Sequence, residues 1–315
     1  MEQRVPRVTL LAVAVCCALP LGAQKLQLPN PALERISEEA EAFARLAPKI
    51  IGRETLHHKG RQGPPRIKWL SIGNAPAVSY RTAEIVSEYG YGHFAEDPEA
   101  LREFRQVVSV DGRQRAATAS RNARQVLAEN MASDNDRLRR RLLEEFEQVG
   151  QTGSATDFGQ ILLLFRRRAL PLYTFEAKKD AMLGTERCEV VHWKQRKGAD
   201  PLSVFSNRQL QRIPMEGDIW LRRGDHLPLR ITMKASLEED GAPITFNAEI
   251  DYKQSRYGLL LPSAMHLEKK SKSLMLIDNR SEYADYQMFG ANSEIIFEAE
   301  TDAGTAAATQ VASKP

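Results

Sequence analysis

A glycine-rich string at residues 90–95 comes nearest to a cofactor-binding motif. Its letters, G-Y-G-H-F-A, match the G-x-G-x-x-A pattern of dinucleotide-binding proteins and follow an expected strand. That pattern holds a pyrophosphate only where a helix begins directly after the glycines inside a strand–helix–strand unit. Here Asp97 and Pro98 intervene, and the chain shows no such alternation. We interpret the string as a chance match and expect no cofactor.

The histidines do not form a metal-binding pattern. None of them belongs to an H-E-x-x-H or similar arrangement, and the one adjacent pair would point to opposite faces of a strand. We therefore expect solvated histidines and no metal site. The six are His57, His58, His93, His192, His226 and His266.

No catalytic motif identifies an enzyme. No serine occupies a G-x-S-x-G elbow, and Cys188 alternates with Val190 in a strand pattern that predicts burial. The 41 acidic residues offer no pair of carboxylates marked out for acid–base work. The sequence favours a non-enzymatic protein, and an unrecognised hydrolase remains as the enzymatic hypothesis.

Two arginine clusters, one near residue 139 and one at residues 166–168, lie beside leucines. A transient contact with an anionic membrane surface is one interpretation. A solvated helix face with glutamate partners such as Glu144 and Glu145 is the other, and we favour it. The first cluster consists of Arg137, Arg139, Arg140 and Arg141.

The N-terminus has the pattern of a cleavable signal peptide. Arg4 and Arg7 form a basic start, residues 8–21 are an apolar run too short to span a bilayer, and Ala23 is a small residue at an expected cleavage site. We expect export and a mature chain that begins near Gln24. Such a chain would be soluble in the periplasm or cell envelope.

Cleavage would change the cysteine content and the charge. It removes Cys16 and Cys17, which leaves Cys188 as the one cysteine and excludes an internal disulfide. The fold must then be held by an ordinary apolar core, for which the chain is long enough. The formal net charge of +3 falls to about +2, which argues against nucleic acid as a partner.

Apolar periodicity predicts helices in the first half and strands in the second. Asn30 caps a helix with one apolar stripe, a second helical region covers about 116–148, and a short helix covers 157–167. The strongest strand signal is a hairpin, in which residues 229–237 and 244–252 alternate apolar and polar side chains. Further strands are expected at 82–91, 104–110, 173–179, 186–194, 217–222, 259–269, 274–279 and 282–289.

Short motifs in the second half form a recognisable series. They are G-D-I-W-L at 217–221, a turn at Gly224, P-L-R-I at 228–231, Tyr252, and G-L-L-L-P at 258–262. The series, within residues 172–298, resembles the LolA-like superfamily, secreted bacterial proteins of the outer-membrane-lipoprotein-sorting type. The resemblance implies an α+β fold: a curved antiparallel β-sheet, an unclosed barrel with packed helices and here an N-terminal helical and β extension. In that family an apolar hollow receives acyl chains.

The expected organisation is one domain behind a signal peptide. The signal peptide covers 1–23, the N-terminal helix, strands and helical insertion of the domain cover 24–171, the antiparallel sheet covers 172–299, and a disordered tail covers 300–315.

Two functional hypotheses stay open. The first is a non-enzymatic periplasmic protein that binds a lipid or a lipoprotein acyl chain in the concave face of the sheet. The second is an envelope assembly or interaction protein with a filled core and a protein partner. Residues of the kind that would line a hollow also fill cores. The candidates are Trp193, Trp220, Ile231, Met233, Phe246, Ala248 and Ile250.

Export is the first testable expectation. N-terminal sequencing of the protein isolated from the cell envelope should give a chain that begins at Gln24 or within a few residues of it, because Ala23 closes the signal-peptide pattern. Intact Met1 in a cytosolic fraction would contradict it.

Overall fold

The structure is a computed structural model that describes residues 30–62, 78–115, 122–133, 135–150, 158–196, 203–206, 209–212, 214–239 and 241–289. The expected signal peptide at 1–23 and the expected tail at 300–315 lie outside these residues. No helix within the described ranges is long and apolar enough to cross a membrane.

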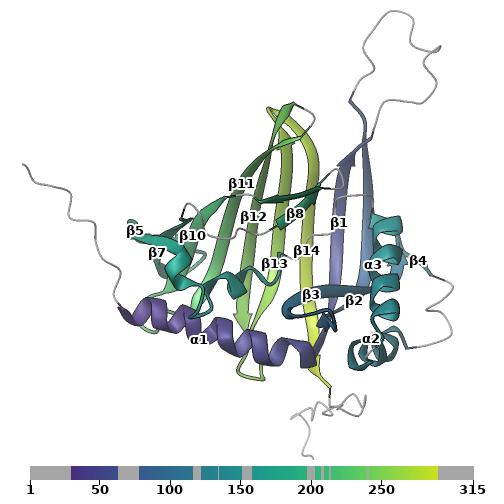
Figure 1. Cartoon of the computed structure of the whole chain (residues 1–315), viewed down its shortest axis with the longest axis horizontal. Helices are drawn as coiled ribbons and strands as arrows, with labels where there is room; N and C mark the ends of the chain where they lie inside the picture. Colours follow the sequence, from purple (N-terminus) through teal and green to yellow (C-terminus); the bar gives the residue numbers. More distant parts are fainter. Residues whose placement is uncertain are drawn as a thin grey trace, which may run out of the picture.

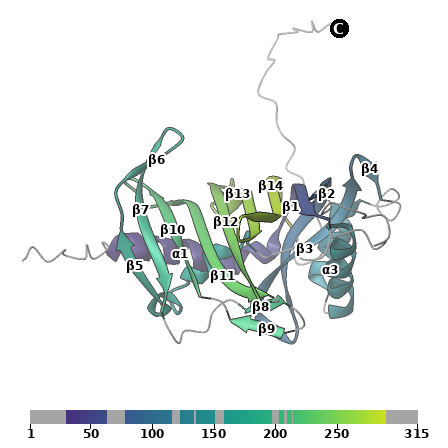
Figure 2. The ribbon, with the colours of Figure 1, turned by 90° about the horizontal axis from the view of Figure 1, so that it is seen from above.

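A twelve-stranded antiparallel sheet dominates the structure (Figure 1). Its strand order is β4-β3-β2-β1-β14-β13-β12-β11-β10-β7-β5, with β6 paired to β7. The sheet is open, since β4 and β5 lie at opposite sides, and Figure 2 shows that it is curved. The predicted α+β class with an unclosed antiparallel sheet is therefore confirmed. The strands are β1 (Ile50–Arg61), β2 (Tyr80–Phe94), β3 (Asp97–Val110), β4 (Arg113–Gln114), β5 (Tyr173–Ala177), β6 (Ala181–Leu183), β7 (Glu186–Gln195), β10 (Met215–Arg222), β11 (Pro228–Glu239), β12 (Ala242–Gln254), β13 (Leu260–Ser271) and β14 (Leu274–Met288). A separate two-stranded sheet pairs β8 (Ser203–Ser206) with β9 (Gln209–Arg212).

The predicted hairpin is present as β11 and β12. Ile231 pairs with Ile250 across it, and the residues of β12 alternate between buried and half-buried. One face of the hairpin is therefore inside the protein, as the period-two pattern predicts.

Strand β1 joins the N-terminal strands to the rest of the sheet, and the sequence did not predict it. It pairs with β2 on one side and with β14 on the other. Its inward positions include polar residues, with Glu54 1% and His58 3% exposed, so the apolar alternation that marks a strand is missing. The expectation that every histidine is solvated is wrong for His58, whose Nδ1 lies 2.6 Å from Asn279 Oδ1.

Several expected elements differ in detail. The helical region at 116–148 is two helices, α2 (Ala123–Ala132) and α3 (Asp136–Gly150), and the short helix at 157–167 is a 3-10 helix, η3 (Ile161–Phe165). Residues 274–279 and 282–289 belong to one strand, β14, rather than two. The string at 90–95 lies in β2 and the turn after it, with no helix following, which agrees with a chance match.

Helix α1 (Asn30–Leu46) runs across the ends of the central strands (Figure 1). It packs against η3 and reaches β13. Its buried stripe, Ala32, Ile36, Ala40 and Phe43, joins the main apolar cluster of the sheet. Two short 3-10 turns, η1 (Ala47–Lys49) and η4 (Leu170–Leu172), lead into β1 and β5.

The two faces of β11 give a direct test of the sheet. Ile231→Asp should lower the free energy of unfolding by about 3–5 kcal/mol, because it places an unpaired charge in the core. Ser236→Asp, at an exposed position of the same strand, should change it by about 0.5 kcal/mol or less. Urea unfolding measures both. Thr232 is a poorer control, since its hydroxyl accepts a hydrogen bond from Asp218 N at 2.9 Å. Equal losses in the two variants would contradict the observed register.

Candidate functional site

Most of the predicted lining residues share one buried face of the sheet. Met233 of β11 lies opposite Ala248 of β12, beside the pair formed by Ile231 and Ile250. Of the predicted lining residues on this face, Phe246 is the most exposed, at 8%. The residues brought together in one apolar cluster are Trp193, Ile231, Met233, Phe246, Ala248 and Ile250.

Trp220 does not join them. Strand β10 alternates strictly, with Ile219 fully buried and Trp220 half-buried. Because neighbouring residues of a strand point to opposite faces, Trp220 lies on the face away from Ile219. The alternation of Ile219 and Leu221 with polar neighbours was the sequence signal for this placement.

Trp193 is fixed in place by a glycine on the next strand. Its indole Nε1 donates a hydrogen bond to Thr232 O at 3.2 Å, which crosses β10 at Gly217. A Cβ at position 217 would lie 1.9 Å from that oxygen and 2.9 Å from the indole nitrogen. Only glycine leaves room for this contact, and the buried polar end of the tryptophan is thereby satisfied.

A short cover closes the apolar face. Phe43 of α1 and Phe165 of η3 are both fully buried in the same cluster as the lining residues. Phe165 meets the ring of Trp193 edge-on, with centroids 5.3 Å apart. The face is therefore shielded from solvent, and an acyl chain would have to displace part of this cover.

Polar contacts tie the cover to the sheet. Tyr252 OH donates to Gly159 O at 3.1 Å and accepts from Leu162 N at 3.3 Å. Gln160 N donates to Glu103 Oε1 at 3.1 Å. These bonds are buried or partly buried and hold the beginning of η3.

A buried ion triad lies next to the cover. Arg105 Nε donates to Glu54 Oε2 at 2.5 Å, and its Nη2 donates to Glu103 Oε2 at 2.9 Å. The three side chains are at most 5% exposed. Burial opposes the charged form of Arg105, but the two carboxylates outweigh it, so the pKa of Arg105 lies well above its ordinary value. The guanidinium also lies over the rings of Tyr89 and Phe146, 5.1 Å and 4.9 Å from their centroids.

The first arginine cluster is largely engaged with the protein itself. Arg139 is buried and donates to the carbonyls of Met131, Ser133 and His93, so it holds α3 against α2 and β2. Arg140 binds both carboxylate oxygens of Glu96 at 2.7 Å, and Arg141 binds Glu145 at 2.9 Å, while Arg137 is exposed. Arg139 is therefore not available for contact with a membrane surface.

The cysteine is buried, and the possible metal ligands are dispersed over the described residues. Cys188 is fully buried in β7, and burial, followed by the charge of Glu186, raises the pKa of its thiol. Such a thiol is a poor nucleophile. Within the described ranges, no three His, Cys, Asp or Glu side chains are grouped to hold a metal ion.

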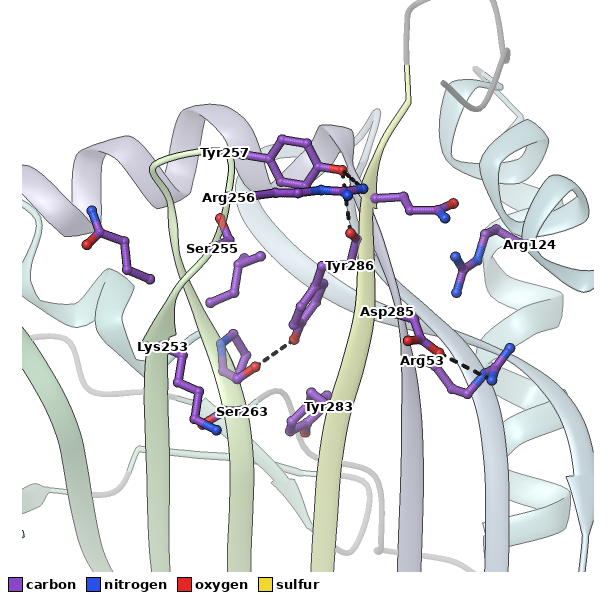
Figure 3. A pocket seen from close by; sticks show the side chains of 14 residues that line it. Arg53, Arg124, Lys253, Ser255, Arg256, Tyr257, Ser263, Tyr283, Asp285 and Tyr286 are labelled. Carbon is purple, nitrogen blue, oxygen red and sulfur yellow. Dashed lines mark hydrogen bonds and ion pairs between the residues drawn. The ribbon is translucent and has the colours of Figure 1, made fainter. Parts of the chain in front are cut away.

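A basic cleft that the sequence did not reveal opens on the other face of the sheet (Figure 3). Its volume is about 730 Å³. The cations come from β1, α2, the end of β12 and the turn after it, so no local charge cluster marks them in the sequence. The charged residues that line it are Arg53, Arg124, Lys253, Arg256 and Asp285.

Two β-bulges build the floor of this cleft. Opposite Gly52, β14 has two residues, Asp285 and Tyr286, and Asp285 has φ of +53°. In β13, Ser263 is an extra residue in the pairing with β12. Tyr286 OH donates to Pro262 O at 2.9 Å, which joins the two bulged strands. Bulges re-aim side chains and are frequent beside functional sites.

Comparisons with known proteins give structural neighbours only. No protein-family model and no curated sequence matches the chain. A putative outer membrane lipoprotein-sorting protein domain from Vibrio parahaemolyticus is 12% identical, with a TM-score of 0.34, and the match covers 81% of this chain and 91% of that one. A DUF1329 family protein from Desulfovibrio piger is 8% identical, with a TM-score of 0.32 and coverage of 82% and 91%. A LolA superfamily protein from Nitrosomonas europaea is 11% identical, with a TM-score of 0.29 and coverage of 82% and 94%.

The first and third of these structures carry the name of the family that the sequence motifs resemble. Their identities and TM-scores are low.

The ion triad predicts a large effect of one substitution. Arg105→Leu should lower the free energy of unfolding by about 3–5 kcal/mol, because it leaves two buried carboxylates without a counter-charge. Part of the loss should be regained as the pH falls, since protonation removes the uncompensated charges. Arg102→Leu, exposed on the same strand, is the matched control and should be mild. Urea unfolding over a pH series measures both, and a mild, pH-independent effect of Arg105→Leu would show that the triad does not hold this region.

Proposed function

We propose that this chain is a non-enzymatic binding protein of the cell envelope that takes an acyl chain, from a lipid or a lipoprotein, on the apolar face of its sheet. The observation that supports the proposal is the cover of that face. A helix and a 3-10 turn cover it, rather than a second sheet. Helices that pack on one face of a sheet open more readily than strands that are hydrogen-bonded on both sides.

The energetics allow exchange of the cover for a ligand. The stripe of α1 contains two alanines, and its large members are Ile36 and Phe43. Exposing each large side chain costs about 1.5–3 kcal/mol. An acyl chain of about fifteen carbons would bring roughly 10 kcal/mol gross. Leu33 and Leu46 of α1 also pack against the cluster, so the gross contribution of the ligand is of the same order as the apolar contact that the helix gives up.

The N-terminal pattern supports an envelope location, where lipids and lipoproteins supply acyl chains. Residues 1–23 have the basic start, apolar run and small residue of an export signal. An exported protein with an apolar sheet face under a light cover is suited to shield a chain from water during transfer.

A second candidate is an envelope interaction protein with a permanently filled core. The low exposure of the lining residues, from fully buried Ile231 to Phe246 at 8%, favours it. In that case α1 is a permanent part of the core, and partners bind to the outer surface. The two candidates differ in whether α1 opens.

A variant of the cover separates them. Phe43→Ala should raise the affinity for a fluorescent fatty acid at least about tenfold, because the open form becomes more populated and the apparent dissociation constant falls with it. Glu34→Ala, at an exposed position of α1, should leave the affinity unchanged. Fluorescence titration measures both. Hydrogen exchange should also show that amides of α1 lose protection when the probe is bound.

A lack of probe binding would contradict the acyl-chain proposal. If neither the wild type nor Phe43→Ala binds the probe saturably, and both remain folded by circular dichroism, the acyl-chain proposal fails. Native mass spectrometry of protein isolated from its own envelope gives an independent check, since a carrier should retain a lipid mass.

A further inference from the structure

The charged side chains of the basic cleft lie on the face of the sheet away from the proposed acyl site, although Leu261 and Tyr283 of the main apolar cluster also line the cleft. Lys253 follows the inward-facing Tyr252 in β12, so its side chain leaves the sheet on the face away from α1. Arg124 belongs to α2, which packs over Gly90, whereas the neighbouring Tyr89 belongs to the main cluster. We propose that this cleft binds a phosphate-type oxyanion, either free or as part of a head group.

One buried nitrogen of Arg124 lacks a hydrogen-bond acceptor among the described residues. Its side chain is 10% exposed, and its Nε donates to Glu88 Oε2 at 2.7 Å. Its Nη2 is buried and has no hydrogen-bond partner among the described residues. A buried charged donor without an acceptor is costly. An oxyanion in the cleft would supply that acceptor, and Figure 3 shows the side chain reaching from α2 toward the strands of Arg53 and Asp285.

The charge of the cleft also favours an anion. Four of its lining residues are cationic and one, Asp285, is acidic. Asp285 binds Arg53 at 3.3 Å, and Glu88 is shared between Arg53 and Arg124. No carboxylate within the described residues forms an ion pair with Lys253. Among the described residues, Arg53, Arg124 and Lys253 outnumber these two carboxylates even when Arg256 is left out of the count.

The donors of the cleft favour phosphate over a carboxylate, since three of its four cations are arginines. Arginine and lysine enter from opposite sides, with Arg124 from α2 and Lys253 and Arg256 from the β12–β13 side (Figure 3). A tetrahedral anion accepts hydrogen bonds in several directions at once, and guanidinium groups match its oxygens in pairs. The volume of about 730 Å³ leaves room for the group that carries the phosphate.

The backbone and the aromatic residues around the cleft hold its charged side chains in place. Asp285 adopts a left-handed conformation at the bulge, which a non-glycine residue rarely does. The ring of Tyr286 lies over Gly52, where a Cβ would come within 2.6 Å of it. Arg256 donates to Tyr257 OH at 2.9 Å, and that hydroxyl also accepts from Met288 N at 3.2 Å. The turn that carries the arginine is thereby fixed to the end of β14.

The experiment is calorimetric titration of the full mature chain with inorganic phosphate, with sodium acetate as the carboxylate comparison. Wild type should bind phosphate saturably and more tightly than acetate. Lys253→Gln/Arg256→Gln changes two exposed cleft residues and should weaken phosphate binding about tenfold for each charged hydrogen bond lost. Lys59→Gln/Arg81→Gln removes two exposed charges elsewhere on the sheet and should bind as wild type does.

Two further arms complete the test. Phosphate should raise the melting temperature of the wild type but not of Arg124→Gln. Sedimentation with phosphatidylcholine vesicles, with and without phosphatidylglycerol, identifies the source of the phosphate. Vesicle binding that requires phosphatidylglycerol and is lost in the cleft variant assigns a lipid head group. Phosphate binding without vesicle binding assigns a soluble phosphorylated ligand.

The proposal is overturned if neither phosphate nor phosphatidylglycerol is bound, if acetate binds as tightly as phosphate, or if the cleft and control variants behave alike. Titration of the cleft variant with a fluorescent fatty acid should give wild-type affinity, so either proposal can fail alone.

Discussion

Arg105 connects two strands and the cover of the sheet through one buried network. It reaches across β2 from β3 to bind Glu54 of β1, and it binds Glu103 of its own strand. Glu103 in turn accepts the backbone N–H of Gln160, where η3 begins. Buried charges persist only when they are paired and hydrogen-bonded. The guanidinium therefore ties β1 to β3, and it orients Glu103, the carboxylate that accepts the N–H at the start of η3.

The same sheet supports different chemistry on its two faces. On the α1 side, the central strands present apolar residues under the cover, and the indole N–H of Trp193 is satisfied within the protein by Thr232 O. On the other side, the bulge in β14 turns Asp285 toward Arg53. Its neighbour Tyr286 packs against the main cluster. In a regular strand the inward position of Tyr283 would place Asp285 inward as well; the extra residue shifts the alternation by one, so that Tyr286 packs inward instead.

The sequence predicts most where burial follows period two. In β11 and β12 every inward position is apolar, so the register of Ile231 opposite Ile250 follows from alternation. It fails for β1, because Glu54 and His58 are inward and their partners are far along the chain. It also fails for the cleft, since a bulge leaves no hydrophobic signal and its cations come from separate segments. Trp220 differs for another reason: a large aromatic side chain is typical of a pocket lining, but its position between the inward Ile219 and Leu221 points it outward.

The two halves of the cover are held with unequal strength. The beginning of η3 is held by bonds from Tyr252 and Glu103 that are buried or partly buried, and such bonds are strong in a low-dielectric interior. Helix α1 is joined to the segment after η3 by Glu41 and Arg166, with side chains 38% and 26% exposed. Exposed ion pairs contribute little. If the cover opens for a ligand, α1 is therefore the part that leaves first, while η3 stays on the sheet and keeps Trp193 covered by Phe165.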